Sequence, residues 1–186
     1  MPRRLRLAVA PLVLLIATLT ACAEPTRLPP PEEPAARAPL FASDEEALAA
    51  ATEAYEEYLA VSNAITSNPD APLAPLQEKT SSAHFENLEA SITQLRAQGL
   101  RSEGSSALAS VELQQHSQIG DEILIVVYVC LDVSSTRLLD QNGNDVTPRD
   151  RADRVALEVA LINESGALRD LIVDGSETWT GGLNCS

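Results

Sequence analysis

The sequence is poor in positive charge. Lysine and arginine together number 13 against 27 acidic residues, and the formal net charge is −14 at pH 7. Proteins that bind nucleic acids neutralise phosphates with clustered lysine and arginine side chains. The composition therefore argues against a nucleic-acid partner. It also argues against direct contact between a folded domain and anionic lipid headgroups.

The chain also lacks the residue patterns of common catalytic and metal sites. Its two histidines, His84 and His116, have no cysteine or carboxylate at metal-ligand spacing. It contains no glycine-rich phosphate loop and no Gly-x-Ser-x-Gly motif. The segment 140–145 is no calcium loop, because glycine is at its fourth position and Arg151 replaces the bidentate glutamate. We expect no metal or cofactor, a turn at 140–145, and both histidines at the surface.

The longest apolar run near the N-terminus is too short for a transmembrane helix. Leu7–Leu19 contains 13 residues, which as a helix span about 20 Å against a hydrocarbon core of roughly 30 Å. Arg3, Arg4 and Arg6 precede the run. A basic start followed by a short apolar run is typical of a secretory signal.

The run ends in Leu19-Thr20-Ala21-Cys22, which resembles the lipobox of bacterial lipoproteins. The resemblance implies that 1–21 is removed and that Cys22 becomes the N-terminus, carrying a diacylglyceryl group on its sulfur and acyl chains such as palmitate. Two or more acyl chains hold a protein stably on a membrane. An ordinary signal peptide followed by a chance cysteine is the alternative. Loss of three arginines changes the formal charge from −14 to −17.

The next segment, 22–42, is a proline-rich stalk without apolar periodicity. In an extended polyproline conformation about twenty residues reach up to roughly 60 Å. The stalk is expected to hold an acidic domain away from an anionic membrane on the extracytoplasmic side. Its prolines are Pro25, Pro29, Pro30, Pro31, Pro34 and Pro39.

A capping box begins the folded domain, which we place at 43–186. Ser43 stands at the N-cap position, Glu46 follows three residues later, and apolar residues then recur at helical spacing. This pattern predicts a helix from Asp44 to Ile65.

Two further helices are expected before the strands begin. Prolines at 69 and 72 end the first helix. A short helix is expected at 73–79 and a long one at 83–98. Gly99 fits a left-handed C′ position, with Leu100 packing back in a Schellman cap. The apolar stripe of the long helix is Phe85, Leu88, Ile92 and Leu95.

After Gly104 the apolar period changes to about two, which predicts strands. The almost unbroken apolar run 123–133 is typical of a central strand. The expected strands are 107–114, 123–133 (continued or re-bent through 134–139), 155–162 and 168–179. The polar connection 145–154 is less regular than a tight hairpin, so the pairing of the strands on either side of it stays open. Two to three helices followed by about four strands predict an α+β fold, with helices packed on one face of a curved antiparallel sheet.

This order of elements looks like the NTF2-like (cystatin-like) superfamily. The segment 128–134, the turn at 140–143 and the spacing of Trp179, Gly182 and Cys185 resemble actinobacterial lipoproteins of that fold. The resemblance implies a cone between helices and sheet. The candidate pocket residues are Tyr55, Tyr58, Tyr128, Asp132 and Trp179, and core packing is the alternative role for each.

Two cysteines remain once Cys22 is assigned to lipid. In an oxidising compartment such a pair usually forms a bridge, so we predict a Cys130–Cys185 disulfide. The alternatives are a buried free Cys130 with a frayed Cys185, or a catalytic thiol. No histidine is near either cysteine in the sequence, which disfavours a catalytic role for their thiols.

Three functions are consistent with these features. The sequence favours a non-enzymatic lipoprotein module that binds an envelope protein or a small apolar ligand. An isomerase or dehydratase of the NTF2-like type is the second hypothesis, with Asp132 and Tyr128 pointing into the cone. An accessory role in a cell-envelope complex is the third.

Overall fold

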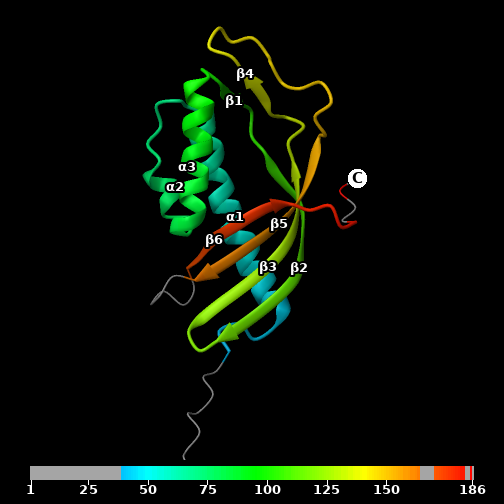
Figure 1. The fold of residues 1–186 in the computed structure, drawn as a ribbon. Coiled ribbons are helices and arrows are strands. Elements are labelled where there is room, and N and C mark those ends of the chain that lie inside the picture. The colour runs from blue at the N-terminus through cyan, green and yellow to red at the C-terminus, as the bar shows by residue number, and fades with distance from the viewer. Residues whose placement is uncertain (1–38, 164–169, 183–184, 186) are drawn as a thin grey trace, which may run out of the picture. The chain divides into compact units, whose positions relative to one another are not determined.

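The computed structural model describes residues 39–163, 170–182 and 185. The predicted signal segment, Cys22 and the stalk up to residue 38 lie outside these residues. The helices are α1 (Asp44–Ser67), α2 (Ala74–Gln77) and α3 (Ser82–Ala97). The strands are β1 (Arg101–Glu103), β2 (Ala107–Ile119), β3 (Glu122–Asp132), β4 (Arg137–Leu139), β5 (Arg154–Asn163) and β6 (Leu171–Thr178) (Figure 1). Within the described part of the chain, no helix combines the length and the apolar character needed to cross a bilayer.

Helix α1 begins where its capping residues predict. The Glu46 amide donates to Ser43 Oγ at 3.3 Å, and the Glu46 carboxylate accepts from the Ala42 amide at 2.7 Å. Acidic side chains in the first turn also stabilise the helix, because their negative charge interacts favourably with the positive end of the helix dipole. The buried stripe faces the sheet as expected and consists of Ala47, Ala51, Tyr55, Tyr58, Leu59 and Ile65.

The folded part of the chain extends further toward the N-terminus than the predicted boundary at Ser43. Phe41 is only 5% exposed and belongs to the core, and its ring meets His116 edge-on with centroids 5.6 Å apart. The Leu40 amide donates to the Gln118 side chain of β2 at 2.7 Å. These contacts attach the chain to the sheet before α1 begins.

Helix α3 ends in the predicted Schellman cap. The Leu100 amide donates to the Leu95 carbonyl at 3.0 Å, and the Gly99 amide donates to the Arg96 carbonyl at 2.9 Å. Gly99 has φ of 69°, a left-handed conformation that glycine adopts without steric cost. The helix therefore stops where the sequence indicates.

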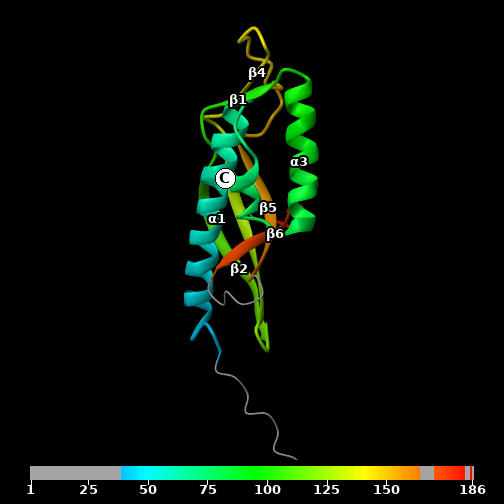
Figure 2. The same ribbon diagram turned by 90° about the vertical axis from the view of Figure 1, so that its left-hand side faces the viewer.

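The main sheet has the antiparallel order β2-β3-β5-β6. Alternate side chains of each strand point to opposite faces. The face that packs on the helices, here called the inner face, carries the buried core (Figure 2). The sheet contributes Ile123, Ile125, Val127, Val129, Val159, Leu161, Leu171 and Val173 to that core. The predicted α+β class and the packing of helices on one sheet face are confirmed.

A sharp bend carries the β2–β3 pair into a small second sheet formed by β1 and β4. At the bend Gly104 has φ of 85°, and a Cβ added there would overlap the Ser135 carbonyl oxygen. Asn63 of α1 satisfies the backbone exposed by the bend. It accepts from the Ser106 amide and hydroxyl at 3.2 and 2.8 Å and donates to the Ser106 carbonyl at 2.9 Å. Segment 134–139 therefore re-bends rather than continuing β3.

The chain between α2 and α3 covers part of the outer edge of β6. The Val173 amide donates to the Lys79 carbonyl and the Ser81 amide donates to the Val173 carbonyl, each at 3.0 Å. This pairing satisfies backbone N–H and C=O groups that an edge strand otherwise leaves without hydrogen-bond partners in the sheet. The predicted last strand begins at 168, but 168–169 lie outside the described residues.

Candidate functional site

The predicted pocket tyrosines of α1 lie in the core. Tyr55 and Tyr58 are 2% and 7% exposed, with ring centroids 5.4 Å apart. Burial raises the pKa of Tyr55, opposed by a hydrogen bond with Ser176. Burial also raises the pKa of Tyr58, opposed by a hydrogen bond with Ser62. Both phenols therefore stay protonated and act as packed, hydrogen-bonded core residues.

His84 lies beside these tyrosines, and the prediction that it is exposed is wrong. The residue is 9% exposed, its ring centroid is 6.3 Å from that of Tyr58, and its Nε2 atom is buried without a described hydrogen-bond partner. Burial lowers the pKa of His84, while the charge of Asp174 acts in the opposite direction. His116 is also largely covered, with its side chain 15% exposed, because it points to the inner face toward Phe41.

The other three candidate residues lie on the opposite face of the sheet, here called the outer face. Tyr128 and Asp132 alternate with Val127 and Val129, whose side chains are fully buried in the core. Trp179 stacks on Tyr128 with centroids 4.6 Å apart. The five predicted residues therefore do not line one pocket. The sheet separates Tyr55 and Tyr58 from the rest, and the enzyme hypothesis based on Asp132 and Tyr128 loses its geometric basis.

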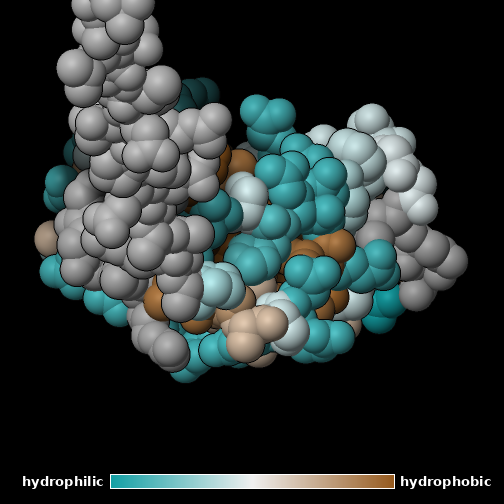
Figure 3. Space-filling model, turned by 90° about the horizontal axis from the view of Figure 1, so that it is seen from below, coloured by the Kyte–Doolittle hydropathy of each residue, from teal (hydrophilic) through white to brown (hydrophobic). Residues whose placement is uncertain are grey.

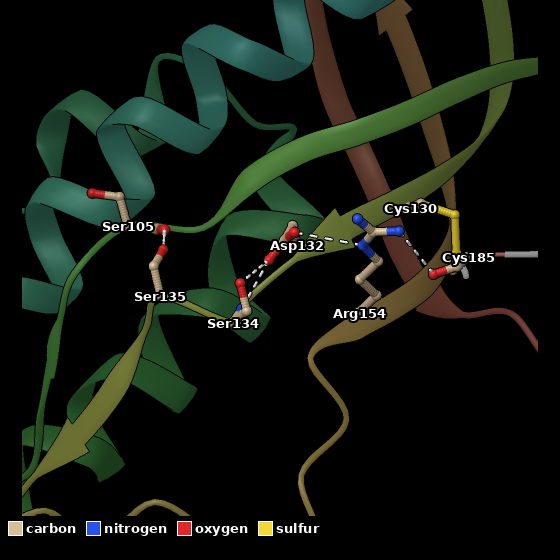
Figure 4. Close-up of polar contacts among 7 residues, drawn as sticks. All are labelled: Ser105, Cys130, Asp132, Ser134, Ser135, Arg154 and Cys185. Atoms are coloured by element: carbon tan, nitrogen blue, oxygen red, sulfur yellow. Dashed lines mark hydrogen bonds and ion pairs between the residues drawn. A yellow bond between two sulfur atoms is a disulfide. The ribbon is translucent and has the colours of Figure 1, made fainter.

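The predicted disulfide is present on the outer face. Cys130 is 1% exposed and is bonded to Cys185, with Cα atoms 5.5 Å apart (Figure 4). The bridge holds residue 185 against β3. Nearby, the backbone at Gly181 approaches the Trp179 ring so closely that an added Cβ would overlap it. These contacts hold Trp179 and residue 185 at the outer face of the sheet.

A polar cluster borders the disulfide (Figure 4). Asp132 accepts from the Ser134 amide at 2.9 Å and from the Ser134 hydroxyl at 2.6 Å, and Arg154 Nε is 3.5 Å from its other oxygen. The hydrogen bonds from Ser134 are the main reason that the pKa of Asp132 is lowered, and Arg154 adds to the effect. Asp132 is thus an ionised residue of the strand end with satisfied oxygens, unlike a catalytic acid with a raised pKa.

The segment 140–145 is a turn, as predicted. Asp140 Oδ2 accepts from the Asn144 side chain at 2.9 Å, and its Oδ1 accepts from the amides of Asn144 and Asn142 at 2.9 and 2.8 Å. The side-chain bond from Asn144 is the main reason that the pKa of Asp140 is lowered, and the amide bonds add to the effect. Gly143 has φ of 81°. Among the described residues no group of three or more potential ligands is placed to hold a metal ion.

The rest of the outer face combines acidic and apolar positions. Strand register aligns Glu112, Tyr128, Glu158 and Glu177 in one row across the four strands. A second row contains Leu124 and Ile162. These two residues and Ile119, which is 80% exposed, line an open hollow of about 550 Å³. Seen from below, the domain shows hydrophobic surface as small areas between hydrophilic residues (Figure 3).

The sequence patterns did not single out Glu112, Glu158 and Glu177 as a group. Ala156, Glu158 and Ala160 point to the same face of β5. A charged residue among small ones on one face of a strand indicates that this face is not buried in the core. The row exists only because three separate strand pairings place its members side by side. No local pattern specifies those pairings.

Comparison with known proteins supports the fold. No family model matches the chain, and no curated protein matches it. Among solved structures, the intermembrane space region of the chloroplast protein ARC6 is similar, with a TM-score of 0.52 at 10% identity, over 70% of this chain and 95% of that one. The periplasmic domain of DotI aligns with a TM-score of 0.43 at 12% identity, over 74% of this chain and 95% of that one.

Proposed function

We propose that this chain is an extracytoplasmic lipoprotein, anchored through Cys22, whose NTF2-like domain is a non-enzymatic binding or accessory module of the cell envelope. The observation that carries the binding role is the outer face of the sheet. It presents Tyr128, Trp179 and the apolar hollow at Leu124 and Ile162 on the side away from the helices. Surface of this mixed kind is typical of protein-binding sites.

The location rests on the cysteines. Disulfides persist mainly in oxidising compartments, and the bond between Cys130 and Cys185 leaves Cys22 as the third cysteine, available for lipid. The similar ARC6 domain bears the name of an intermembrane-space region, which agrees with an extracytoplasmic location. The stalk would then allow the acidic domain to reach partners away from the membrane surface.

The test of the anchor is the intact mass of protein extracted from membranes, measured with and without reduction. We expect a chain that begins at Cys22, carries diacylglyceryl and acyl groups, and gains two hydrogens on reduction. An unlipidated chain found free outside the cell would contradict the proposal.

The test of the binding role is photo-crosslinking in intact cells. A photoreactive amino acid replaces Gln115, an exposed residue on the outer face. The control position is Glu89, an exposed residue of α3. We expect a discrete protein adduct at Gln115 and none at Glu89. Equal labelling at both positions, or no adduct at Gln115, would refute a binding role for this face.

A further inference from the structure

We propose that the outer face of the sheet binds a cationic, partly apolar segment of a partner protein. Basic side chains would lie over the row formed by Glu112, Glu158 and Glu177, here called the glutamate row. Apolar side chains would fill the hollow at Leu124 and Ile162. This inference rests on the proposed binding function and names the chemistry of the partner.

The glutamate row places like charges close together. Glu158 and Glu177 are direct cross-strand partners, and Glu112 and Glu158 flank Tyr128. Neighbouring strands lie about 4.8 Å apart, and like charges directly opposite each other destabilise a strand pair. Among the described residues no ion pair reaches these three carboxylates. The only polar contact described for the row is the hydrogen bond between the Tyr128 hydroxyl and Glu158.

Arg154, the cross-strand partner of Asp132, is a basic residue of this sheet that is already engaged. Arg154 lies 3.5 Å from Asp132 and donates to the Cys185 carbonyl at 3.5 Å. The repulsion within the row is therefore left for an external cation to relieve. A partner that supplies arginine or lysine side chains would gain from that arrangement and would be drawn by the net negative charge of the chain.

The apolar part of the face lies further along the same strands, with Val126 and Ala160 between it and the glutamate row. Leu124 and Ile162 are cross-strand partners and half-buried, and Ile119 stands 80% exposed at the end of β2. Glu122 and Asp174 also line the hollow, so its rim repeats the acidic character of the row. A partner segment that fits this face therefore carries both basic and apolar side chains.

The same charges exclude two other occupants. A second copy of the chain packed face to face would bring two glutamate rows together without compensating cations. An anionic lipid surface would be repelled by the row. A basic protein segment is the occupant whose charge complements the face.

Trp179 provides a direct assay, because it is the single tryptophan and stacks on Tyr128 within the row. Full-length protein in non-ionic detergent is titrated with a twelve-residue peptide of alternating basic and apolar character, made from arginine, leucine, serine and glycine. Two control peptides replace all arginines with glutamate or all leucines with serine. We expect only the arginine–leucine peptide to bind tightly and to change the fluorescence of Trp179.

Paired variants test the location. Glu158→Gln with Glu177→Gln should weaken binding about fivefold to tenfold, since each exposed ion pair contributes up to about 1 kcal/mol. Ile119→Ser, at an exposed position, should also weaken binding. The matched control is Glu56→Gln with Glu89→Gln, which removes the same charge from exposed helical positions and should leave affinity within about twofold.

Three results would overturn the inference. These are equal weakening by both glutamine pairs, absence of arginine–leucine binding at accessible concentrations, and a concentration-dependent dimer that the outer-face variants abolish. The outcome is separate from the anchoring test. A chain without lipid would refute the proposed anchor and leave the titration unchanged, and failed peptide binding would leave the anchor intact.

Discussion

The bend at Gly104 is expected to be the position most sensitive to addition of a single methyl group. Gly104→Ala places an alanine at φ of 85°, where a side chain costs about 1–2 kcal/mol. The new Cβ also overlaps the Ser135 carbonyl oxygen and approaches Thr136 Cα within 3.4 Å. Displacing that backbone adds about 1–3 kcal/mol. We expect a total loss of about 2–5 kcal/mol of unfolding free energy.

Gly143→Ala is the matched control for backbone conformation alone. Gly143 has φ of 81°, and an added Cβ meets nothing within 4 Å. Its loss should be only about 1–2 kcal/mol. For a domain of this size each kcal/mol lowers Tm by roughly 3 °C, so thermal unfolding followed by circular dichroism separates the two variants. Equal Tm values would show that Ser135 does not restrict the bend.

Three further perturbations address other parts of the domain. Replacing Cys130 and Cys185 together by serine opens a loop with a sequence separation of 55 residues, and urea unfolding should show a loss of about 4 kcal/mol; an unchanged midpoint would contradict this. Because burial lowers the pKa of His84, the unfolded chain binds a proton more readily. Stability should therefore be complete above pH about 6.5 and fall as the pH decreases through the lowered folded-state pKa; His84→Gln should flatten that slope between pH 7.5 and 5.0. Asn63→Ala leaves the Ser106 backbone at the bend without its partner and should cost about 2–3 kcal/mol in the same urea assay.

The helices could be predicted from sequence because their ends are marked locally. Ser43 accepts from an amide three residues away, and Gly99 needs only its own left-handed conformation. Strand β1 has no such mark. It is three residues long, and its pairing with β4 depends on the bend at Gly104, so no pattern of alternation revealed it.

The prediction that the five candidate residues line one pocket was wrong for a different physical reason. In the run 123–133 nearly every side chain is apolar, so the sequence does not show which parity faces the helices. The structure places Val127 inward and Tyr128 outward, and the disulfide buries Cys130 on the outward side. His84 was misjudged because Phe85 carries the apolar stripe, whereas Tyr58 of α1 lies beside the histidine ring. Burial of that kind depends on neighbours distant in sequence.

The attachment of Leu40 and Phe41 to β2 has a mechanical consequence. Tension on the chain before residue 39 meets the buried Phe41 ring and the Leu40–Gln118 hydrogen bond before it reaches the first turn of α1. Helices unravel easily from a loaded end, since each broken turn frees the next. Because the sheet takes the load, tension applied before residue 39 would pull on the β2 end of the domain and leave α1 wound.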